Sequence, residues 1–198
     1  MRVSVVTPPS PVVTWEEADD HLRLDRDAEQ KAFVENLVKA ATGLLDGPDG
    51  LLGRALGLQT LECRLDELGS EPLFLPCPPF VDVESIRFVG REGAIVVPAD
   101  AYVVDEGYLV ASASGWPALP ADWGRPRVRI LYRAGYAVDP NAAPYVPSVP
   151  DPIKAAILLM VGDLYRFRTT ASDMNITSTA IPMAASVSTL LQPYKVYR

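Results

Sequence analysis

The spacing of apolar residues changes twice along the chain, and this change constrains the fold more than any other feature. Around residues 33–45 the apolar residues recur every three or four positions, as in a helix with one buried face. From Leu61 to Leu65 every second residue is apolar, which is typical of a strand with one solvated face. Helical spacing returns after residue 151. We therefore expect a helical part that is interrupted by a β part.

Two helices are predicted to supply most of the helical core. Asp25 or Asp27 is expected to cap the first, and the turn at Asp46–Gly50 to end it. Asp151 is expected to cap the second, with Pro152 at its first position. The apolar stripe of the first helix is Phe33, Leu37, Ala41 and Leu44, with Val34, Val38 and Leu45 beside it. The stripe of the second is Ile153, Ile157, Met160, Val161 and Leu164.

Shorter helices are predicted at three places. Thr14 and Glu17 have the spacing of a capping box, so a helix is expected from about Trp15 to Leu22. Further helical pieces are expected at Leu51–Leu56 and Ala184–Leu191.

The β part is expected to be an antiparallel unit over residues 58–136. Its strands are short and closely spaced, and glycine-containing turns at Gly90–Gly93 and Asp105–Gly107 predict hairpins. This spacing favours an antiparallel sheet over alternating strands and helices. The other predicted strands are Leu73–Leu75, Val83–Val89, Ala94–Val97, Tyr102–Val104, Tyr108–Val110 and Arg127–Tyr132.

Prolines mark the junctions between these parts. The chain has 198 residues and 19 prolines, and five of the prolines fall within residues 137–152. Proline ends helices and central strands, so this stretch is expected to be an extended crossover. The prediction is an α+β fold in which a small helical bundle is interrupted by an inserted antiparallel β unit, with extended N- and C-terminal segments. Its segments are an N-terminal arm and helices (1–57), the β unit (58–136), the crossover and core helix (137–168) and a C-terminal tail (169–198).

The charge distribution is uneven. The formal net charge is −7, which argues against wrapping nucleic acid tightly, because phosphate binding requires Lys and Arg. By region it is −6 over residues 1–70, −3 over 71–150 and +2 over 151–198. The start of the chain lacks a signal-peptide pattern, and the apolar run Ala155–Val161 is too short to span a bilayer. We expect synthesis in the cytoplasm.

Residues for catalysis or metal binding are not evident in the sequence. His21 is the only histidine and lies near a helix end, where a surface or capping role is favoured. Cys63 and Cys77 have no metal or redox spacing and are interpreted as small buried apolar residues. Phosphate-binding glycine loops and nucleophile elbows are absent from the sequence. We therefore predict that the protein is not an enzyme and that it has no catalytic residue, no cofactor and no metal site.

Two groups of residues are candidates for contacts with partners. Arg125, Arg127 and Arg129 alternate along one strand, so they face one side. They contact either phosphate or acidic neighbours, including those of an adjacent subunit, and the acidic β unit favours the second reading. The C-terminal tail keeps large side chains that are costly to leave in water, so it is expected to dock on its own core or on a partner. The tail residues are Ile181, Met183, Leu190, Leu191, Tyr194, Tyr197 and Arg198.

Short motifs follow one another in a characteristic order over residues 8–198. They are Thr14–Ala18, His21–Arg23, Gly53–Leu56, Gln59-Thr60, Leu75–Pro79, Val83–Ile86, Tyr102–Asp105, Gly115–Pro117, Val128–Tyr132, Ala134–Tyr136, Val149-Pro150, Ile153, Ala156, Leu158-Leu159, Tyr165–Arg168 and Leu190–Tyr194. Their order resembles the head–tail connector (adaptor) family of long-tailed phages and phage-like gene-transfer particles. The chain differs from the family pattern by an insertion at Asp46–Gly50 and by Lys195 where Arg is more usual.

The resemblance implies a structural protein of a virion or phage-like particle at the head–tail junction. It implies a ring, dodecameric in this family, that stacks on the portal protein and continues the DNA channel towards a tail-side completion or stopper protein. DNA would pass without specific binding, and the isolated chain would be a monomer in some members. The tail residues would then reach the portal, and the host particle could be a phage, a prophage or a gene-transfer particle.

A second hypothesis from the residues is a cytoplasmic module that binds a small ligand or a glycan. Trp116, Trp123 and Tyr108 would line its pocket in the β unit.

Overall fold

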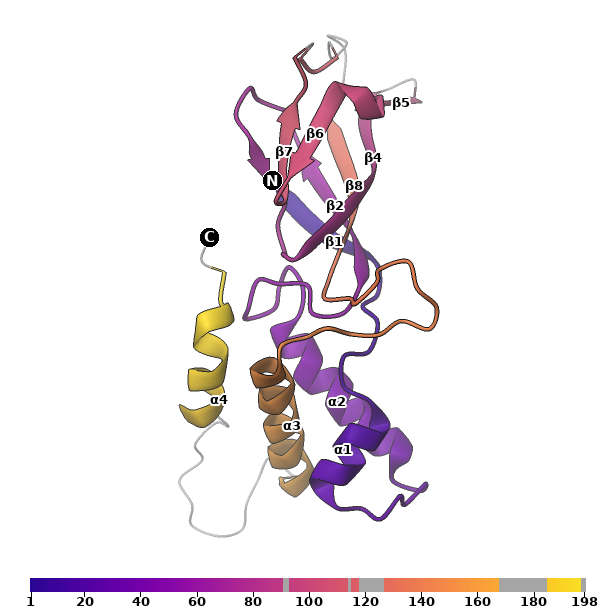
Figure 1. Cartoon of the computed structure of the whole chain (residues 1–198), viewed down its shortest axis with the longest axis vertical. Coiled ribbons are helices and arrows are strands. Elements are labelled where there is room, and N and C mark those ends of the chain that lie inside the picture. Colours follow the sequence, from indigo (N-terminus) through magenta and orange to yellow (C-terminus); the bar gives the residue numbers. More distant parts are fainter. Residues whose placement is uncertain (91–92, 114, 118–126, 168–184, 197–198) are drawn as a thin grey trace.

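The computed structural model describes residues 1–90, 93–113, 115–117, 127–167 and 185–196. The fold is α+β, as predicted: a β unit stands on a helical part along the long axis of the molecule (Figure 1). The elements are β1 (Arg2–Thr7), α1 (Trp15–Leu22), α2 (Lys31–Leu45), β2 (Gln59–Leu65), β3 (Leu73–Phe74), β4 (Phe80–Gly90), β5 (Gly93–Val96), η1 (Ala99–Ala101), β6 (Tyr102–Asp105), β7 (Tyr108–Ala111), β8 (Val128–Ala134), α3 (Asp151–Arg166), α4 (Ala185–Leu191) and η2 (Gln192–Tyr194).

The β unit contains two antiparallel sheets that share one apolar core. The larger has the order β1-β2-β8-β4-β5 and the smaller the order β3-β7-β6. β2 and β8 alternate strictly between buried and half-buried residues, as the period of two predicts. Leu61, Ile130 and Tyr132 of the larger sheet lie in the same buried cluster as Leu109 of the smaller one. The predicted strands are confirmed, with ends shifted by up to three residues.

The N-terminal arm, expected only to be extended, is an edge strand of the larger sheet. β1 pairs antiparallel with β2, so that Arg2 lies opposite Arg64 and Val3 opposite Cys63. The chain then descends into the helical part, where Val12 and Val13 are buried.

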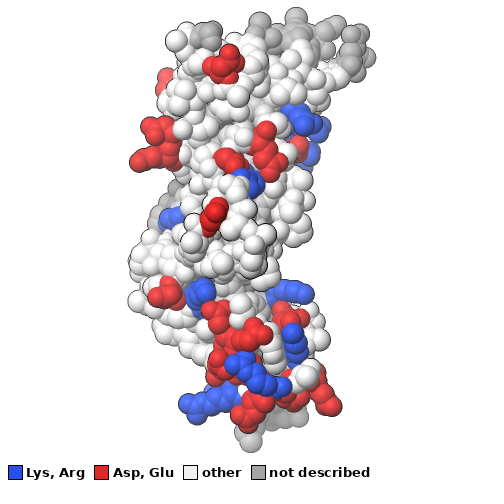
Figure 2. All heavy atoms as spheres, turned by 45° about the vertical axis from the view of Figure 1, so that its right-hand side comes forward, with Lys and Arg blue, Asp and Glu red and all other residues white. Residues whose placement is uncertain are grey.

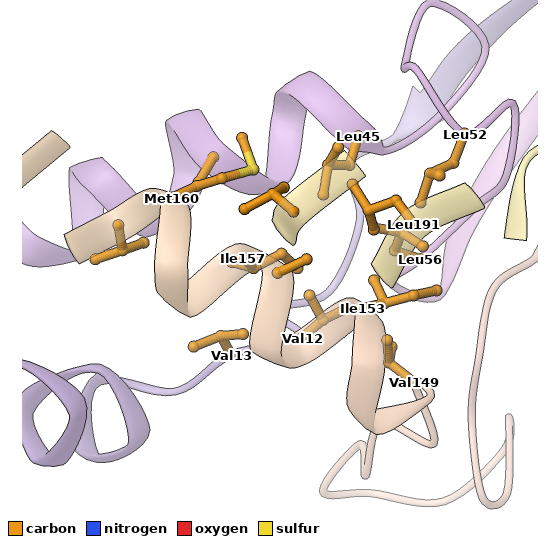
Figure 3. Packing of buried hydrophobic residues seen from close by; sticks show 14 of the residues in the cluster. Val12, Val13, Leu45, Leu52, Leu56, Val149, Ile153, Ile157, Met160 and Leu191 are labelled. Atoms are coloured by element: carbon orange, nitrogen blue, oxygen red, sulfur yellow. The ribbon is translucent and has the colours of Figure 1, made fainter. Parts of the chain in front are cut away.

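The helical core is built around α3, with α1, α2 and α4 against it (Figures 1 and 3). Its buried α3 residues are Ile153, Ala156, Ile157, Met160 and Val161, which matches the predicted stripe except that Leu164 is only partly buried. Each large side chain buried here contributes on the order of 2 kcal/mol. The Thr14–Glu17 capping box of α1 is present as predicted.

Four local helix predictions were wrong. α2 begins at Lys31, because Asp27 instead accepts from the Glu29 amide and caps a preceding turn. Its buried residues are Val34, Ala41 and Leu45, while Phe33 and Leu44 are exposed, so the stripe is rotated. Residues 51–56 do not form a helix: residues 51–52 lie in a turn, and Arg54 forms isolated β-bridges with Asp46 and Cys77.

The fourth correction concerns the start of α3. Asp151 is its first helical residue, Pro150 is the N-cap, and no side chain caps the helix. The proline-rich stretch before it forms neither helix nor long strand, as expected; its backbone is joined at Val138 and Val146 by a hydrogen bond of 3.1 Å.

Two glycines allow the chain segments to cross between the helical part and the β unit. A Cβ on Gly57 would lie 2.0 Å from the carbonyl oxygen of Ser10. A Cβ on Gly135, which has φ +134°, would lie 2.4 Å from the carbonyl oxygen of Gly57. Neither position can accept a side chain without backbone movement. Within the described residues, none of the helices has the length and apolar character needed to cross a membrane.

Candidate interaction surfaces

The described part of the C-terminal tail packs on the chain's own helical core. Val187 and Leu191 are 1% and 0% exposed, and Figure 3 shows Leu191 beside Leu52 and Leu56. Leu190 and Tyr194 are half-buried against the same cluster. Ile181, Met183, Tyr197 and Arg198 lie outside the described residues. The predicted helix at 184–191 is confirmed as α4, and the structure of the single chain shows docking on its own core.

Main-chain contacts hold the end of the tail. The Arg54 Nε donates to the Tyr194 carbonyl at 2.6 Å, and the Val196 amide donates to the Leu52 carbonyl at 2.9 Å. Arg54 Nη1 also lies 3.5 Å from the Tyr136 hydroxyl. Burial raises the pKa of Tyr136, and the nearby Arg54 charge opposes this shift. Arg54 thus joins the tail to the segment that follows β8.

Asp46 is the centre of a second polar cluster between the two parts. Its carboxylate accepts from the Leu56 amide and from Gln59 Nε2 at 3.0–3.1 Å. Burial raises the pKa of the Asp46 carboxyl, and these hydrogen bonds oppose the shift. Gln59 is 2% exposed, and its Oε1 has no hydrogen-bond partner within the described chain. The cluster fixes the turn that follows α2 against the first residue of β2.

Arginines form a row across the outer face of the larger sheet. The register places Arg2 opposite Arg64, Arg64 opposite Arg129, and Arg129 opposite Arg87. Neighbouring strands are about 4.8 Å apart, so the row crosses four strands with one cation on each. Arg127 immediately precedes β8 and is on the same face as Arg129, because Val128 and Ile130 point into the core. These five residues are called the arginine face.

Few carboxylates neutralise the arginine face. Glu62, which is 15% exposed, pairs with Arg64 and lies 3.9 Å from Arg129. Within the described residues, Arg2, Arg87 and Arg127 form no ion pair, and the Nε atoms of Arg127 and Arg129 have no hydrogen-bond partner. A cavity of about 160 Å³ lies among Glu62, Arg87 and Arg129.

The contacts predicted for Arg125, Arg127 and Arg129 stay a prediction. Arg127 and Arg129 share one face, as the alternation predicts, while Arg125 lies outside the described residues. Sequence reasoning missed Arg2, Arg64 and Arg87. Their positions in alternating strands could have assigned them to a solvated face, but only the sheet register brings them together.

A groove of about 730 Å³ lies between the N-terminal arm and α2. Pro8, Pro9 and Val38 form part of its apolar lining. The described residues of the two predicted interface groups do not line this groove.

The remaining candidate residues do not form a chemical site in the described part of the chain. His21 is exposed in the last turn of α1, as expected. Cys63 and Cys77 are 0% and 1% exposed, as predicted, and burial raises the pKa of Cys63 to about 11. The described residues include no group of three or more His, Cys, Asp or Glu that could hold a metal.

The aromatic residues of the ligand-binding hypothesis belong to separate pairs. Trp116 stacks on Tyr102 with ring centroids 6.4 Å apart and donates to the Gly69 carbonyl at 3.0 Å. Tyr108 packs on Phe74 at 5.1 Å. Trp123 lies outside the described residues. The two described aromatics thus pack within the β unit, each with its own ring partner.

No protein-family model matches the chain. No curated protein sequence matches it either. Similar folds are found among solved structures of gene transfer agent (GTA) particles.

One similar chain is in the neck of an empty GTA particle, computed with C6 symmetry; it has a TM-score of 0.73 and 21% identity over 100% of this chain and 97% of that chain. A second is in the virion of a native GTA particle, with a TM-score of 0.73, 22% identity and the same coverage. A third is in the neck of a native GTA particle computed with C12 symmetry, with a TM-score of 0.68, 20% identity and the same coverage. Because the match covers nearly the whole of both chains, it shows that helical part and β unit together form one fold shared with these particle chains.

Proposed function

We propose that the chain is a non-enzymatic head–tail connector (adaptor) that forms a homo-oligomeric ring at the neck of a phage-like particle. The observation that carries this proposal is the match along the full length of both chains to structures of GTA necks. Those necks were computed with six-fold and twelve-fold symmetry, which supports a homo-oligomeric ring. The ring would lie between a portal protein and a tail-side completion or stopper protein, and would extend the DNA channel.

Loss of the protein should separate heads from tails. Deleting its gene in a producing host should leave filled heads and free tails that do not join, and a plasmid copy should restore complete particles. Normal particles in the deletion strain would contradict the proposal.

The C-terminal tail is proposed to reach the portal in the assembled ring. Its support is the net positive charge of residues 151–198 and the half-buried Leu190 and Tyr194, which keep part of their surface available. Deleting the whole tail would also remove the core residues Val187 and Leu191, so it would test folding and docking together. Removal of residues 197–198 together with Lys195→Glu leaves α4 in place.

The tail variant should fold but fail to join particles. Its melting temperature should equal that of the wild type, while its amount per purified particle should fall at least about tenfold, the effect of roughly 1.4 kcal/mol of lost binding. The matched control is Gln192→Glu, an exposed change in the same segment. Wild-type incorporation of the tail variant would exclude portal docking through these residues.

A further inference from the structure

We propose that the arginine face of one copy packs against the outer face of the smaller sheet of the next copy. The inference rests on the proposed ring and adds which surfaces form its subunit contact. It assigns a partner, a second copy of this chain, to a cluster of cations that the single chain leaves largely unneutralised.

The outer face of the smaller sheet is apolar at its centre and acidic at the β6–β7 turn. Val103, Tyr108 and Phe74 are 58%, 46% and 37% exposed. Asp105 and Glu106 are exposed in the β6–β7 turn beside them. The sequence has no Lys or Arg from Leu65 to Ile86 or from Glu92 to Gly124, so all of β3, β6 and β7 lack a basic residue. This surface is called the acid-edged face.

The two faces are complementary in charge and lie on opposite sides of the β unit. The inner sides of both sheets share one core, so their outer sides point away from each other (Figure 1). A head-to-tail contact brings unlike faces together and can close into a ring, whereas a two-fold contact would place arginines against arginines. The helical part differs from these two faces of the β unit, because charges of both signs lie close together at its end (Figure 2).

Arginine suits such a contact because its guanidinium binds carboxylates while its aliphatic stem covers apolar surface. Arg87 and Arg2 are exposed and do not take part in the ion pairs of Glu62, which involve Arg64 and Arg129. Their guanidinium groups are therefore available to carboxylates of a neighbour. Contact with DNA phosphates would use the arginine face alone and leave Val103 and Tyr108 in water. A second copy covers both surfaces, which favours a protein partner over nucleic acid.

Charge reversal and charge exchange test this contact. Arg2→Glu/Arg87→Glu changes the arginine face without touching the Glu62 pairs, and Asp105→Lys/Glu106→Lys changes the acid-edged face. The control Arg23→Glu/Lys39→Glu makes the same charge change on exposed residues of the helical part. Circular dichroism establishes that each variant folds. The tagged chain is then quantified on purified particles from a strain that lacks the native copy.

Each double reversal should lower incorporation at least about tenfold, because like charges then face each other across every contact. Combining the two double reversals in one chain exchanges the charges of the two faces, and this four-residue variant should restore incorporation to within about threefold of the wild type. The helical control should incorporate normally. Wild-type incorporation of Arg2→Glu/Arg87→Glu would overturn the inference, while a neck ring of the wild-type chain would leave the proposed function intact.

Failure of the charge exchange to restore incorporation would also overturn it. If, in addition, the wild-type chain bound a DNA duplex at low salt and Arg2→Glu/Arg87→Glu did not, the arginine face would be assigned to phosphate instead. Absence of the wild-type chain from the neck would refute the proposed function itself.

Discussion

Arg54 Nε donates to the carbonyl oxygen of Tyr194 at 2.6 Å, across 140 residues of sequence. The same guanidinium lies beside the Tyr136 hydroxyl, so one side chain connects the tail with the end of the β unit. The C-terminal tail is thereby held in a defined place on the single chain.

Removing this contact should loosen the tail without unfolding the core. Arg54→Ala should lower the free energy of unfolding by about 1–3 kcal/mol, since a charged donor to a partly buried carbonyl is lost. Amide hydrogen exchange should increase in residues 185–196 and remain unchanged in β2 and β8. Unchanged protection of α4 would show that Leu191 and Val187 hold the tail unaided.

The ionisation of Asp46 should make the stability of the protein depend on pH. The folded state raises the pKa of this carboxyl, so the unfolded chain releases the proton at lower pH. The ionised group therefore lowers stability at neutral pH, and this cost disappears as the pH falls through the raised pKa. Asp46→Asn, which keeps an acceptor for the Leu56 amide, should be at least as stable as the wild type at pH 7, and the difference should shrink on acidification.

Comparing Asp46→Ala with Asp46→Asn distinguishes the effect of the carboxylate charge from the effect of its hydrogen bonds. It leaves the Leu56 amide and the Gln59 side chain without their acceptor, so it should cost about 1–3 kcal/mol at pH 7. Denaturant unfolding at several pH values measures both variants. A constant difference between Asp46→Asn and the wild type from pH 7 to pH 4 would contradict a raised pKa.

The crossing of the chain at Gly57 should not tolerate a side chain. Gly57→Ala places a methyl group 2.0 Å from the Ser10 carbonyl, so we expect a loss above about 3 kcal/mol or no soluble protein. Gly43→Ala is the matched control, because it lies on α2 with no atom within 4 Å of the new Cβ. It should be neutral or stabilising by up to about 1 kcal/mol. Equal melting temperatures for the two variants would disprove the tight crossing.

Cys63 should be unreactive in the folded protein. Its thiol is fully buried, and its pKa of about 11 leaves little thiolate at neutral pH. In a Cys77→Ala background, modification by a thiol reagent at pH 8 should proceed at the rate of unfolding and become fast only in denaturant. Rapid labelling without denaturant would show that the β core opens locally.

The fold class and most elements could be predicted because they depend on local periodicity. The alternation at Leu61–Leu65 and the spacing of Ile153, Ile157 and Val161 follow directly from one buried face per element. The Thr14–Glu17 box is local as well. The start of α2 was misplaced because Asp27 had two local uses, and its turn with Glu29 replaced the expected cap.

The candidate interaction surfaces were less predictable because they depend on long-range pairing. The sequence pattern identified only Arg125, Arg127 and Arg129, which are predicted to lie along a single strand. Arg2 joins it through β1, whose pairing with β2 spans about 60 residues and has no local signal. The tail shows the same limit: its apolar residues indicate docking, but tertiary packing alone decides that Leu191 fills the core beside Leu56.

The central claim is tested most directly by electron microscopy of particles that carry a tagged copy of the chain in place of the native one. The connector account predicts a ring of density at the neck, with the tag repeated around the particle axis, and copies of this fold should fit into that ring. Tag density elsewhere on the particle, or particles that lack the chain and still carry joined tails, would contradict the account.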